Sequence, residues 1–139
     1  MIASLERKDL LYPELSYKIV GCAFDVFNQI GTGLLEKNYQ RALAAALRNS
    51  KLKFKEQVAH DLLFHEEKIG RGYFDFLVEE KIIIEIKRGK FYFGNELGQV
   101  SQYLKMSNLQ LGIIIRFSQE GVRIKRVVNI PTENNFPST

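Results

Sequence analysis

Apolar positions in the first third of the chain follow the spacing of α-helices. Between Glu14 and Gln29 they recur every three or four residues, and Pro13 stands where helices often begin. Gly31-Thr32-Gly33 ends this pattern, because glycine readily takes the backbone conformations that close a helix. A second segment, from Leu34 to Asn49, is rich in alanine and leucine, which are strong helix formers. The pattern therefore predicts an N-terminal pair of helices.

From Phe54 onward the hydrophobic pattern becomes that of β-strands. Short runs rich in aromatic and β-branched residues cover 54–64, 73–78 and 82–87. The polar segments between these runs, 65–72 and 79–81, are predicted to be turns. Short connections of this kind join antiparallel neighbours, so we expect three antiparallel strands.

The last third of the chain returns to one helix and then to strands. Asn95 is a plausible N-cap for a helix from Glu96 to Met106. The almost wholly apolar run Leu111 to Phe117 predicts a strand buried on both faces, and a turn at 119–121 leads into a last strand over 122–130. The order α-α-β-β-β-α-β-β predicts an α/β fold in which helices flank a mixed β-sheet.

Length and composition limit the chain to one ordinary globular domain. With 139 residues, 45% of them hydrophobic and 26% charged, it can bury a single core. We assign residues 1–130 to this domain and expect the polar residues 131–139 to form a disordered tail. No segment resembles a membrane span or a secretory signal, so we expect a cytoplasmic protein with no membrane partner. The lone Cys22 is expected to be a small buried residue.

One Glu-x-Lys triplet interrupts a hydrophobic strand. Glu85 and Lys87 follow Ile82-Ile83-Ile84, whereas the other three such triplets of the chain lie in polar segments. Alternate residues of a strand share a face, so Glu85 and Lys87 point together. A three-residue turn at 79–81 would place Asp75 opposite Glu85, and Tyr73 opposite Lys87. The sequence therefore predicts that three charged side chains converge on one face of the sheet.

Two carboxylates in this cross-strand register would repel each other at a Cβ separation of about 5 Å. Lys87 can supply one compensating positive charge. A hard divalent ion such as Mg²⁺, which takes carboxylate oxygens as ligands, can supply more. The alternative that these residues leave open is an exposed sheet face that carries a Glu–Lys pair beside a solvated Asp75.

The spacing of these residues resembles a known signature. Asp75, nine further residues and Glu85-Ile86-Lys87 resemble the signature of PD-(D/E)XK nucleases. The segment Gly33-Leu34-Leu35-Glu36-Lys37-Asn38-Tyr39 resembles the motif of the GxxExxY proteins, a branch of that superfamily. The resemblance spans about residues 14–129, with similar segments ELSYKIVG at 14–21, GTGLLE at 31–36 and QVSQYLK at 99–105.

The resemblance implies a restriction-endonuclease-like core and a metal-dependent nuclease. It implies that Asp75, Glu85 and the Ile86 carbonyl bind Mg²⁺ or Mn²⁺, and that Lys87 is the catalytic lysine. Glu36 matches an acidic residue that some members add to the site, although a favourable interaction with the helix dipole would also explain it. Tyr39 shares a helix face with Glu36, where core packing and a role in the site both stay open.

The resemblance extends to residues that would contact substrate. Gln99 and Tyr103, four residues apart on one helix, match a Gln-x-x-x-Tyr motif that would orient the substrate or the lysine; a half-buried tyrosine with a polar neighbour is the alternative. Four cations near the site could neutralise phosphates or be ordinary surface residues: Arg88, Lys90, Lys105 and Arg116.

The expected partner is nucleic acid, with DNA favoured over RNA, and the formal net charge of +4 is compatible with a polyanion. A catalytically silent module that only binds nucleic acid or protein is the alternative from another class. The chain is also small enough to act as a subunit of a larger defence or repair assembly, and a homodimer stays open.

Overall fold

The helices and strands follow the predicted order. The computed structural model describes residues 11–89 and 94–129, apart from the side chains of residues 94 and 95. Its elements, in chain order, are α2 (Pro13–Ile30), α3 (Glu36–Asn49), β1 (Phe54–Phe64), β2 (Glu67–Val78), β3 (Ile82–Arg88), α4 (Gly94–Ser107), β4 (Leu111–Ser118) and β5 (Gly121–Val128).

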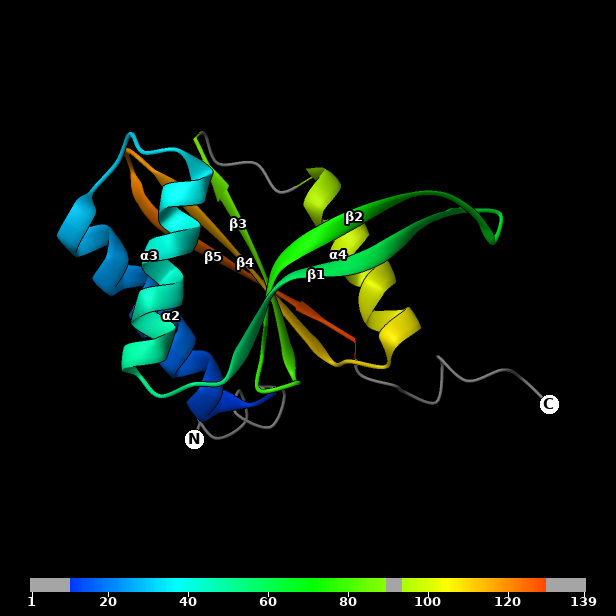
Figure 1. Cartoon of the computed structure of the whole chain (residues 1–139), viewed down its shortest axis with the longest axis horizontal. Coiled ribbons are helices and arrows are strands. Elements are labelled where there is room, and N and C mark those ends of the chain that lie inside the picture. The colour runs from blue at the N-terminus through cyan, green and yellow to red at the C-terminus, as the bar shows by residue number, and fades with distance from the viewer. Residues whose placement is uncertain (1–10, 90–93, 130–139) are drawn as a thin grey trace, which may run out of the picture.

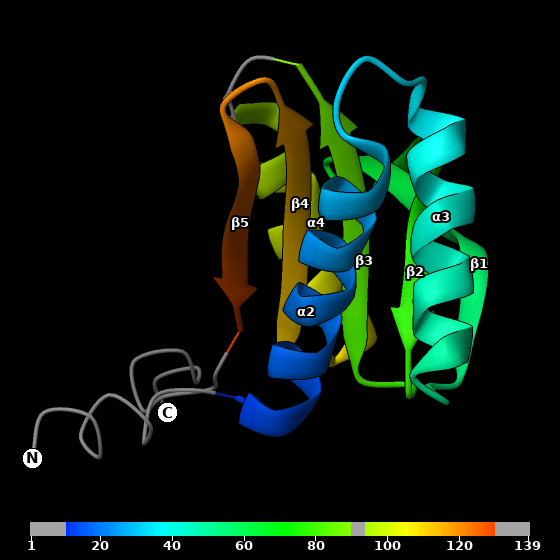
Figure 2. The same ribbon diagram turned by 90° about the vertical axis from the view of Figure 1, so that its left-hand side faces the viewer.

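The five strands form one mixed sheet in the order β1-β2-β3-β4-β5. The pairs β1–β2 and β2–β3 are antiparallel, as predicted, and β4 pairs with β5 in the same way. β3 and β4 are parallel, and α4 makes the connection that parallel strands require. Helices α2 and α3 cover one face of the sheet and α4 covers the other (Figures 1 and 2). The result is a three-layer α/β fold.

Each face of the sheet has its own hydrophobic core. Ile84 and Ile86 of β3 pack in the core under α2 and α3, whereas Ile83 packs in the core under α4. This alternation confirms that Ile84 and Ile86 lie on the face opposite to Glu85 and Lys87. All eight residues of β4 are buried, which confirms the prediction of a strand covered on both faces.

The polar segment at 65–72 is not a turn, contrary to the prediction. Strand β2 already begins at Glu67, and the hairpin turns at His65 and Glu66, whose φ angles are 49° and 67°. The first residues of β2 are largely exposed, so neither face of the hairpin end needs apolar residues. A strand of this kind carries no hydrophobic alternation, which is why the sequence pattern missed it.

Smaller differences lie at helix ends. Helix α3 begins at Glu36 rather than at Leu34, because Leu35 has an extended conformation at the N-cap. Helix α4 begins at Gly94, so Asn95 lies inside its first turn and is not the N-cap. Strand β5 ends at Val128; the predicted tail at 131–139 lies outside the described residues.

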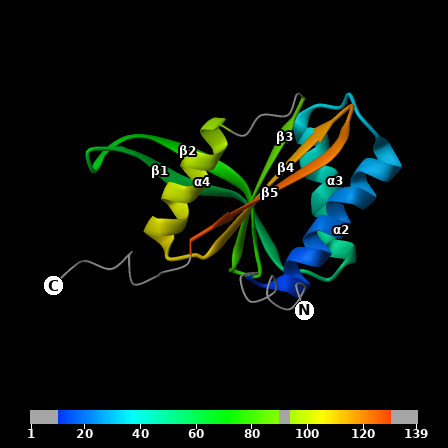
Figure 3. The same cartoon turned by 180° about the vertical axis from the view of Figure 1, so that it is seen from behind.

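The outer part of the β1–β2 hairpin, residues 58–74, leaves the sheet and extends over α4 (Figures 1 and 3). We call it the hairpin arm. The bend that precedes it lies at Gln57, whose φ angle of 53° is unusual for a strand residue. Across this bend the simple alternation of β2 fails, because Phe76 packs under α2 and α3 while Phe74 packs under α4. The bend separates β2 from β3 next to Asp75.

Within the described residues, none of the helices is both long enough and apolar enough to span a lipid bilayer.

Candidate active site

Asp75 lies where β2 and β3 part. The ladder between these strands pairs Val78 with Ile82, as predicted, and continues only to Phe76 and Ile84. Beyond it, the Asp75 carboxylate replaces the missing ladder contact, because its Oδ2 accepts a hydrogen bond from the Ile86 main-chain nitrogen at 2.7 Å. The side chain of Asp75 is thereby directed towards β3.

The hairpin arm also explains why two predicted cross-strand pairs, Asp75 with Glu85 and Tyr73 with Lys87, are missing from the ladder. Tyr73 was expected to lie opposite Lys87, but the strands have already separated at that point, and Tyr73 pairs instead with Ala59 of β1. The three-residue turn at 79–81 was correct, so the local register was right and the extension of the ladder was wrong. The β2–β3 ladder therefore ends beside Asp75.

Glu85 is a buried carboxylic acid. The residue is only 9% exposed, and its Oε1 atom has no hydrogen-bond partner among the described residues. Burial, followed by the neighbouring Asp75 carboxylate, raises the pKa of Glu85 from 4.5 to about 8. Lys87 opposes this rise, since its Nζ lies 3.6 Å from Glu85 Oε2. The positive charge of Lys87 thus compensates only part of the cost of ionising Glu85.

The interactions of Glu85 with Asp75 and with Lys87 bring the three predicted side chains to one place. Asp75 comes from β2 at the root of the hairpin arm, while Glu85 and Lys87 come from one face of β3. Lys87 retains some solvent contact, with 30% of its side chain exposed. The arrangement offers two carboxylates and an ammonium group at the point where the β2–β3 ladder ends.

The residues at this point fit a divalent cation. A cation would satisfy the orphaned Oε1 atom of Glu85 and relieve the repulsion between the two carboxylates. In the described part of the chain, no group of three or more Asp, Glu, His or Cys residues is placed to hold a metal. Glu36, exposed in the first turn of α3, therefore does not complete a three-carboxylate cluster with Asp75 and Glu85. Water and main-chain oxygens, such as the Ile86 carbonyl, would have to supply the other ligands.

Gln99 and Tyr103 have different surroundings on α4. Gln99 is exposed. The Tyr103 ring packs edge-on against Phe74 and His60 of the hairpin arm, with centroids 5.1 and 5.9 Å away. Tyr103 therefore joins α4 to the arm. Sequence reasoning missed His60, which stacks on Phe74 at 4.1 Å, because one histidine in a strand carries no distinguishing pattern.

The four candidate phosphate contacts differ in their exposure to solvent. Arg88 is exposed and lines a hollow of about 420 Å³ together with Gly33 and Phe117, and Lys105 is exposed in the last turn of α4. Lys90 lies outside the described residues. Arg116, by contrast, is only 6% exposed.

The environment of Arg116 is that of a structural residue. Its NH2 group pairs with Glu96 of α4 at 2.8 Å, and its NH1 group donates to the Arg88 carbonyl at 3.0 Å. These bonds tie the end of β3 to α4. Glu96 was not predicted, because a glutamate in a first helical turn is well explained by the helix dipole. We therefore exclude Arg116 from the candidate phosphate contacts.

Tyr39 packs in the core, which settles the question that the sequence left open. Its side chain is 1% exposed, stacks on Phe117 with centroids 4.4 Å apart, and donates a hydrogen bond to the Gly31 carbonyl at 2.8 Å. The motif Gly-x-x-Glu-x-x-Tyr thus anchors the loop between α2 and α3 through its tyrosine.

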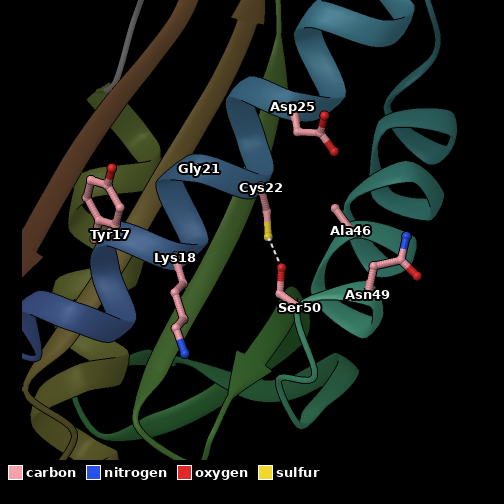
Figure 4. A pocket seen from close by; sticks show the side chains of 8 residues that line it. All are labelled: Tyr17, Lys18, Gly21, Cys22, Asp25, Ala46, Asn49 and Ser50. Carbon is pink, nitrogen blue, oxygen red and sulfur yellow. Dashed lines mark hydrogen bonds between the residues drawn. The ribbon is translucent and has the colours of Figure 1, made fainter.

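A hollow of about 430 Å³ lies between α2 and α3, on the face of the sheet opposite to α4 (Figure 4). Cys22 forms part of its wall, is buried as predicted, and has its Sγ atom 3.3 Å from Ser50 Oγ. Lys18 and Tyr17 lie at this hollow and are exposed. None of the candidate site residues lines it.

Comparison with known proteins agrees with this geometry. One solved structure of similar fold, described as the crystal structure of SSO0001, gives a TM-score of 0.52 at 16% sequence identity. The match covers 70% of this chain and 52% of that one, so the chain spans about half the length of the solved protein. Comparison with curated proteins gives no match. Residues 13–127 match the family model described as the PD-(D/E)XK nuclease superfamily, so the fold is restriction-endonuclease-like and the chain belongs to this superfamily.

Proposed function

We propose that the protein is a metal-dependent nuclease that hydrolyses phosphodiester bonds, with DNA as the favoured substrate. The observation that carries this proposal is the pairing of the Asp75 and Glu85 carboxylates at a partly buried point beside Lys87. A buried, orphaned Glu85 oxygen next to a second carboxylate disfavours the metal-free site and favours a cation. Membership of the nuclease superfamily supports the same activity.

Asp75 and Glu85 would hold Mg²⁺ or Mn²⁺, with the Ile86 carbonyl as a further ligand. When bound, such an ion makes a scissile phosphate more electrophilic and water more acidic. The hydrogen bond from the Ile86 nitrogen fixes the Asp75 carboxylate, so the site is preorganised on the β2 side. Glu36 would act only through water, since it does not join the two carboxylates in one cluster.

Lys87 would act on the reacting groups directly. Its ammonium group lies beside Glu85 and keeps solvent contact, so it can donate hydrogen bonds to an attacking water or to a phosphate oxygen. As negative charge builds up on the phosphate in the transition state, the ammonium stabilises it. Removal of Lys87 should therefore lower the rate of cleavage more than the affinity for substrate.

Residues outside this centre would position the substrate. Gln99 is proposed as a polar contact from the exposed side of α4, and Tyr103 as a positioning residue that acts by holding the hairpin arm. Arg88, Lys90 and Lys105 are proposed contacts to phosphates. Charge contacts of this kind carry no base specificity, so the choice of DNA over RNA is a matter for experiment.

The test is cleavage by the purified chain. Linear duplex DNA, circular duplex DNA, single-stranded DNA and RNA are incubated with Mg²⁺, with Mn²⁺ and with EDTA. We expect metal-dependent products that disappear in Lys87→Ala and Asp75→Ala. Lys18→Ala is the matched control, because this exposed lysine lies on the far face of the sheet, and it should cleave as the wild type does.

Two outcomes would overturn the proposal. Cleavage that persists in both Lys87→Ala and Asp75→Ala would come from a contaminating nuclease. A folded wild-type protein that binds nucleic acid but cleaves none of these substrates with either metal would be a silent binding module.

A further inference from the structure

We propose that Tyr73 is a stacking platform for an unpaired base next to the scissile phosphate, and that Arg71 beside it contacts the adjoining phosphate. This inference rests on the proposed nuclease function and deepens it. It assigns the protein to substrates that are single-stranded or locally unpaired, because a base inside an intact duplex has no free face to offer.

The position of Tyr73 follows from its neighbours in β2. Phe74 is 1% exposed and packs under α4, against Tyr103 and His60. Because successive strand residues point to opposite faces, Tyr73 points away from α4. It precedes Asp75 by two residues, which corresponds to about 7 Å along a strand. Tyr73 is thus two residues along β2 from Asp75 of the proposed metal site, on the exposed face of the hairpin arm.

Exposure alone would not single out Tyr73. It is 52% exposed, but Tyr17 on α2 is 81% exposed. Tyr73 differs because it lies on β2 two residues before Asp75 and because its partner across the β1–β2 ladder is the small residue Ala59. Alanine leaves that side of the ring uncovered, so a planar base has room to stack.

Arg71 shares the exposed face of the arm with Tyr73. Its guanidinium carbon lies 5.9 Å from the centre of the Tyr73 ring, within the range of a cation–π contact. Across the ladder from Arg71 is Asp61, whose carboxylate is paired with Lys68 at 3.4 Å. Within the part of the chain that the structure describes, Arg71 forms no ion pair of its own. A cation held beside an aromatic ring suits a base and its phosphate together.

The underside of the arm is packed in a way that would keep this platform fixed. His60 stacks on Phe74 at 4.1 Å, and Tyr103 of α4 contacts both rings. Gly72, between Arg71 and Tyr73, makes room for this stack, since a Cβ atom there would lie 2.7 Å from His60 Nε2. A platform anchored to α4 loses little freedom when a base stacks on it, and this favours affinity.

The experiment compares binding and cleavage of a fluorescent single-stranded oligonucleotide with those of its duplex. Base–aromatic stacking of about 1–3 kcal/mol corresponds to a loss of about 5- to 150-fold in affinity. We expect Tyr73→Ala to raise Kd and KM for the single strand by that factor, with little change in kcat or in duplex binding. Tyr73→Phe should retain single-strand binding, and Tyr17→Ala is the control with a still more exposed ring on α2.

Arg71→Ala gives a second, independent readout. We expect it to lower the slope of log K against log salt concentration by about one, as loss of one phosphate contact does. Circular dichroism and thermal unfolding of each variant separate a loss of binding from a loss of structure.

The outcomes distinguish this inference from the proposed function. Suppose that the wild type cleaves, that Lys87→Ala does not, and that Tyr73→Ala binds the single strand as the wild type does. Tyr73 is then not a stacking platform, whereas the proposed nuclease function is supported. Equal weakening of single strand and duplex by Tyr73→Ala also overturns the platform. If single-strand binding depends on Tyr73 but no substrate is cleaved, the stacking role of Tyr73 is supported and the proposed nuclease function is wrong.

Discussion

Asp75 and Ile86 are joined by a hydrogen bond in which the Ile86 main-chain nitrogen donates to Asp75 Oδ2 at 2.7 Å. This bond spans the place where the β2–β3 ladder ends, so the same carboxylate closes the gap between the strands and faces Glu85. Structure and proposed chemistry therefore depend on different properties of Asp75, namely its ability to accept a hydrogen bond and its charge.

Substitution at Asp75 should separate these two properties. Asp75→Asn keeps an oxygen that can accept the Ile86 bond, so we expect its free energy of unfolding to stay within about 1 kcal/mol of the wild type. Asp75→Ala should lose about 1–3 kcal/mol. Both variants should lose cleavage. Urea unfolding in EDTA measures the first effect, and equal stability of the two variants would show that the bond contributes nothing.

Glu85 should make the metal-free protein less stable as the pH rises. Burial and Asp75 raise its pKa to about 8 in the folded chain, against 4.5 as the ordinary value. The unfolded chain thus loses this proton from about pH 4.5, while the folded chain keeps it until about pH 8. Since the folded state binds more protons in this window, the contribution of Glu85 to stability falls from about pH 4.5 to pH 8 and is then constant.

Glu85→Gln should remove that slope. Above pH 8 the variant should be more stable than the metal-free wild type by about 1–3 kcal/mol, because a neutral amide replaces a buried charge. Urea unfolding in EDTA across this pH range tests the expectation. If the free energies of unfolding of the wild type and the variant depend on pH in the same way, the expectation is wrong.

Metal binding should release a proton from Glu85. At pH 7 the side chain is largely protonated, so a divalent ion must displace this proton, and affinity should rise with pH until about pH 8. Calorimetric titration of Mn²⁺ in buffers of different ionisation enthalpy counts the protons released. Affinity that does not change with pH, or that survives in Asp75→Asn, would place the metal elsewhere.

Arg116 should matter for stability and not for substrate affinity. Arg116→Ala leaves Glu96 unpaired, and breaking a buried ion pair in this way costs about 3–5 kcal/mol. The remaining folded protein should have an unchanged KM. Arg123→Ala is the control, because the pair of Arg123 with Glu120 is exposed and long, at 3.9 Å, and its loss should cost less than about 1 kcal/mol. If the Arg116→Ala variant has a raised KM at temperatures where the variant is folded, Arg116 does contact a phosphate of the substrate.

Gly112 should set how closely α4 approaches β4. A Cβ atom at this position would lie 2.5 Å from Val100 Cγ1, so Gly112→Ala should destabilise the fold by about 1–3 kcal/mol. Val100→Ala in the same chain should recover part of the loss, because it removes the clashing methyl group. Gly21→Ala, with nothing within 4 Å of the added Cβ, should be neutral or slightly stabilising in thermal unfolding. Equal effects of the two glycine substitutions would rule out the clash.

The part of the candidate site that depends on local strand periodicity could be predicted from the sequence. Glu85 and Lys87 share a face because strand residues alternate, and the three-residue turn set the local register that brings Asp75 beside Glu85. The element order followed from hydrophobic periods and from a long apolar strand. These features depend on neighbours within a few residues along the chain.

The outer half of β2 and the role of Arg116 depended on contacts between distant segments. The hairpin arm is exposed along much of its length, so its sequence shows no buried face and resembles a loop. Arg116 appears as a cation at the end of an apolar strand, and only the docking of α4 brings Glu96 to it.

The sequence by itself determined which side chains share a face of the central strands, because backbone geometry fixes that alternation wherever a strand forms. Only the tertiary structure decided where β2 leaves β3, which cations stay exposed and which aromatic rings of the hairpin arm pack against α4. These outcomes depend on the packing of α4 against the hairpin arm, and such long-range contacts leave no periodic signal in the chain.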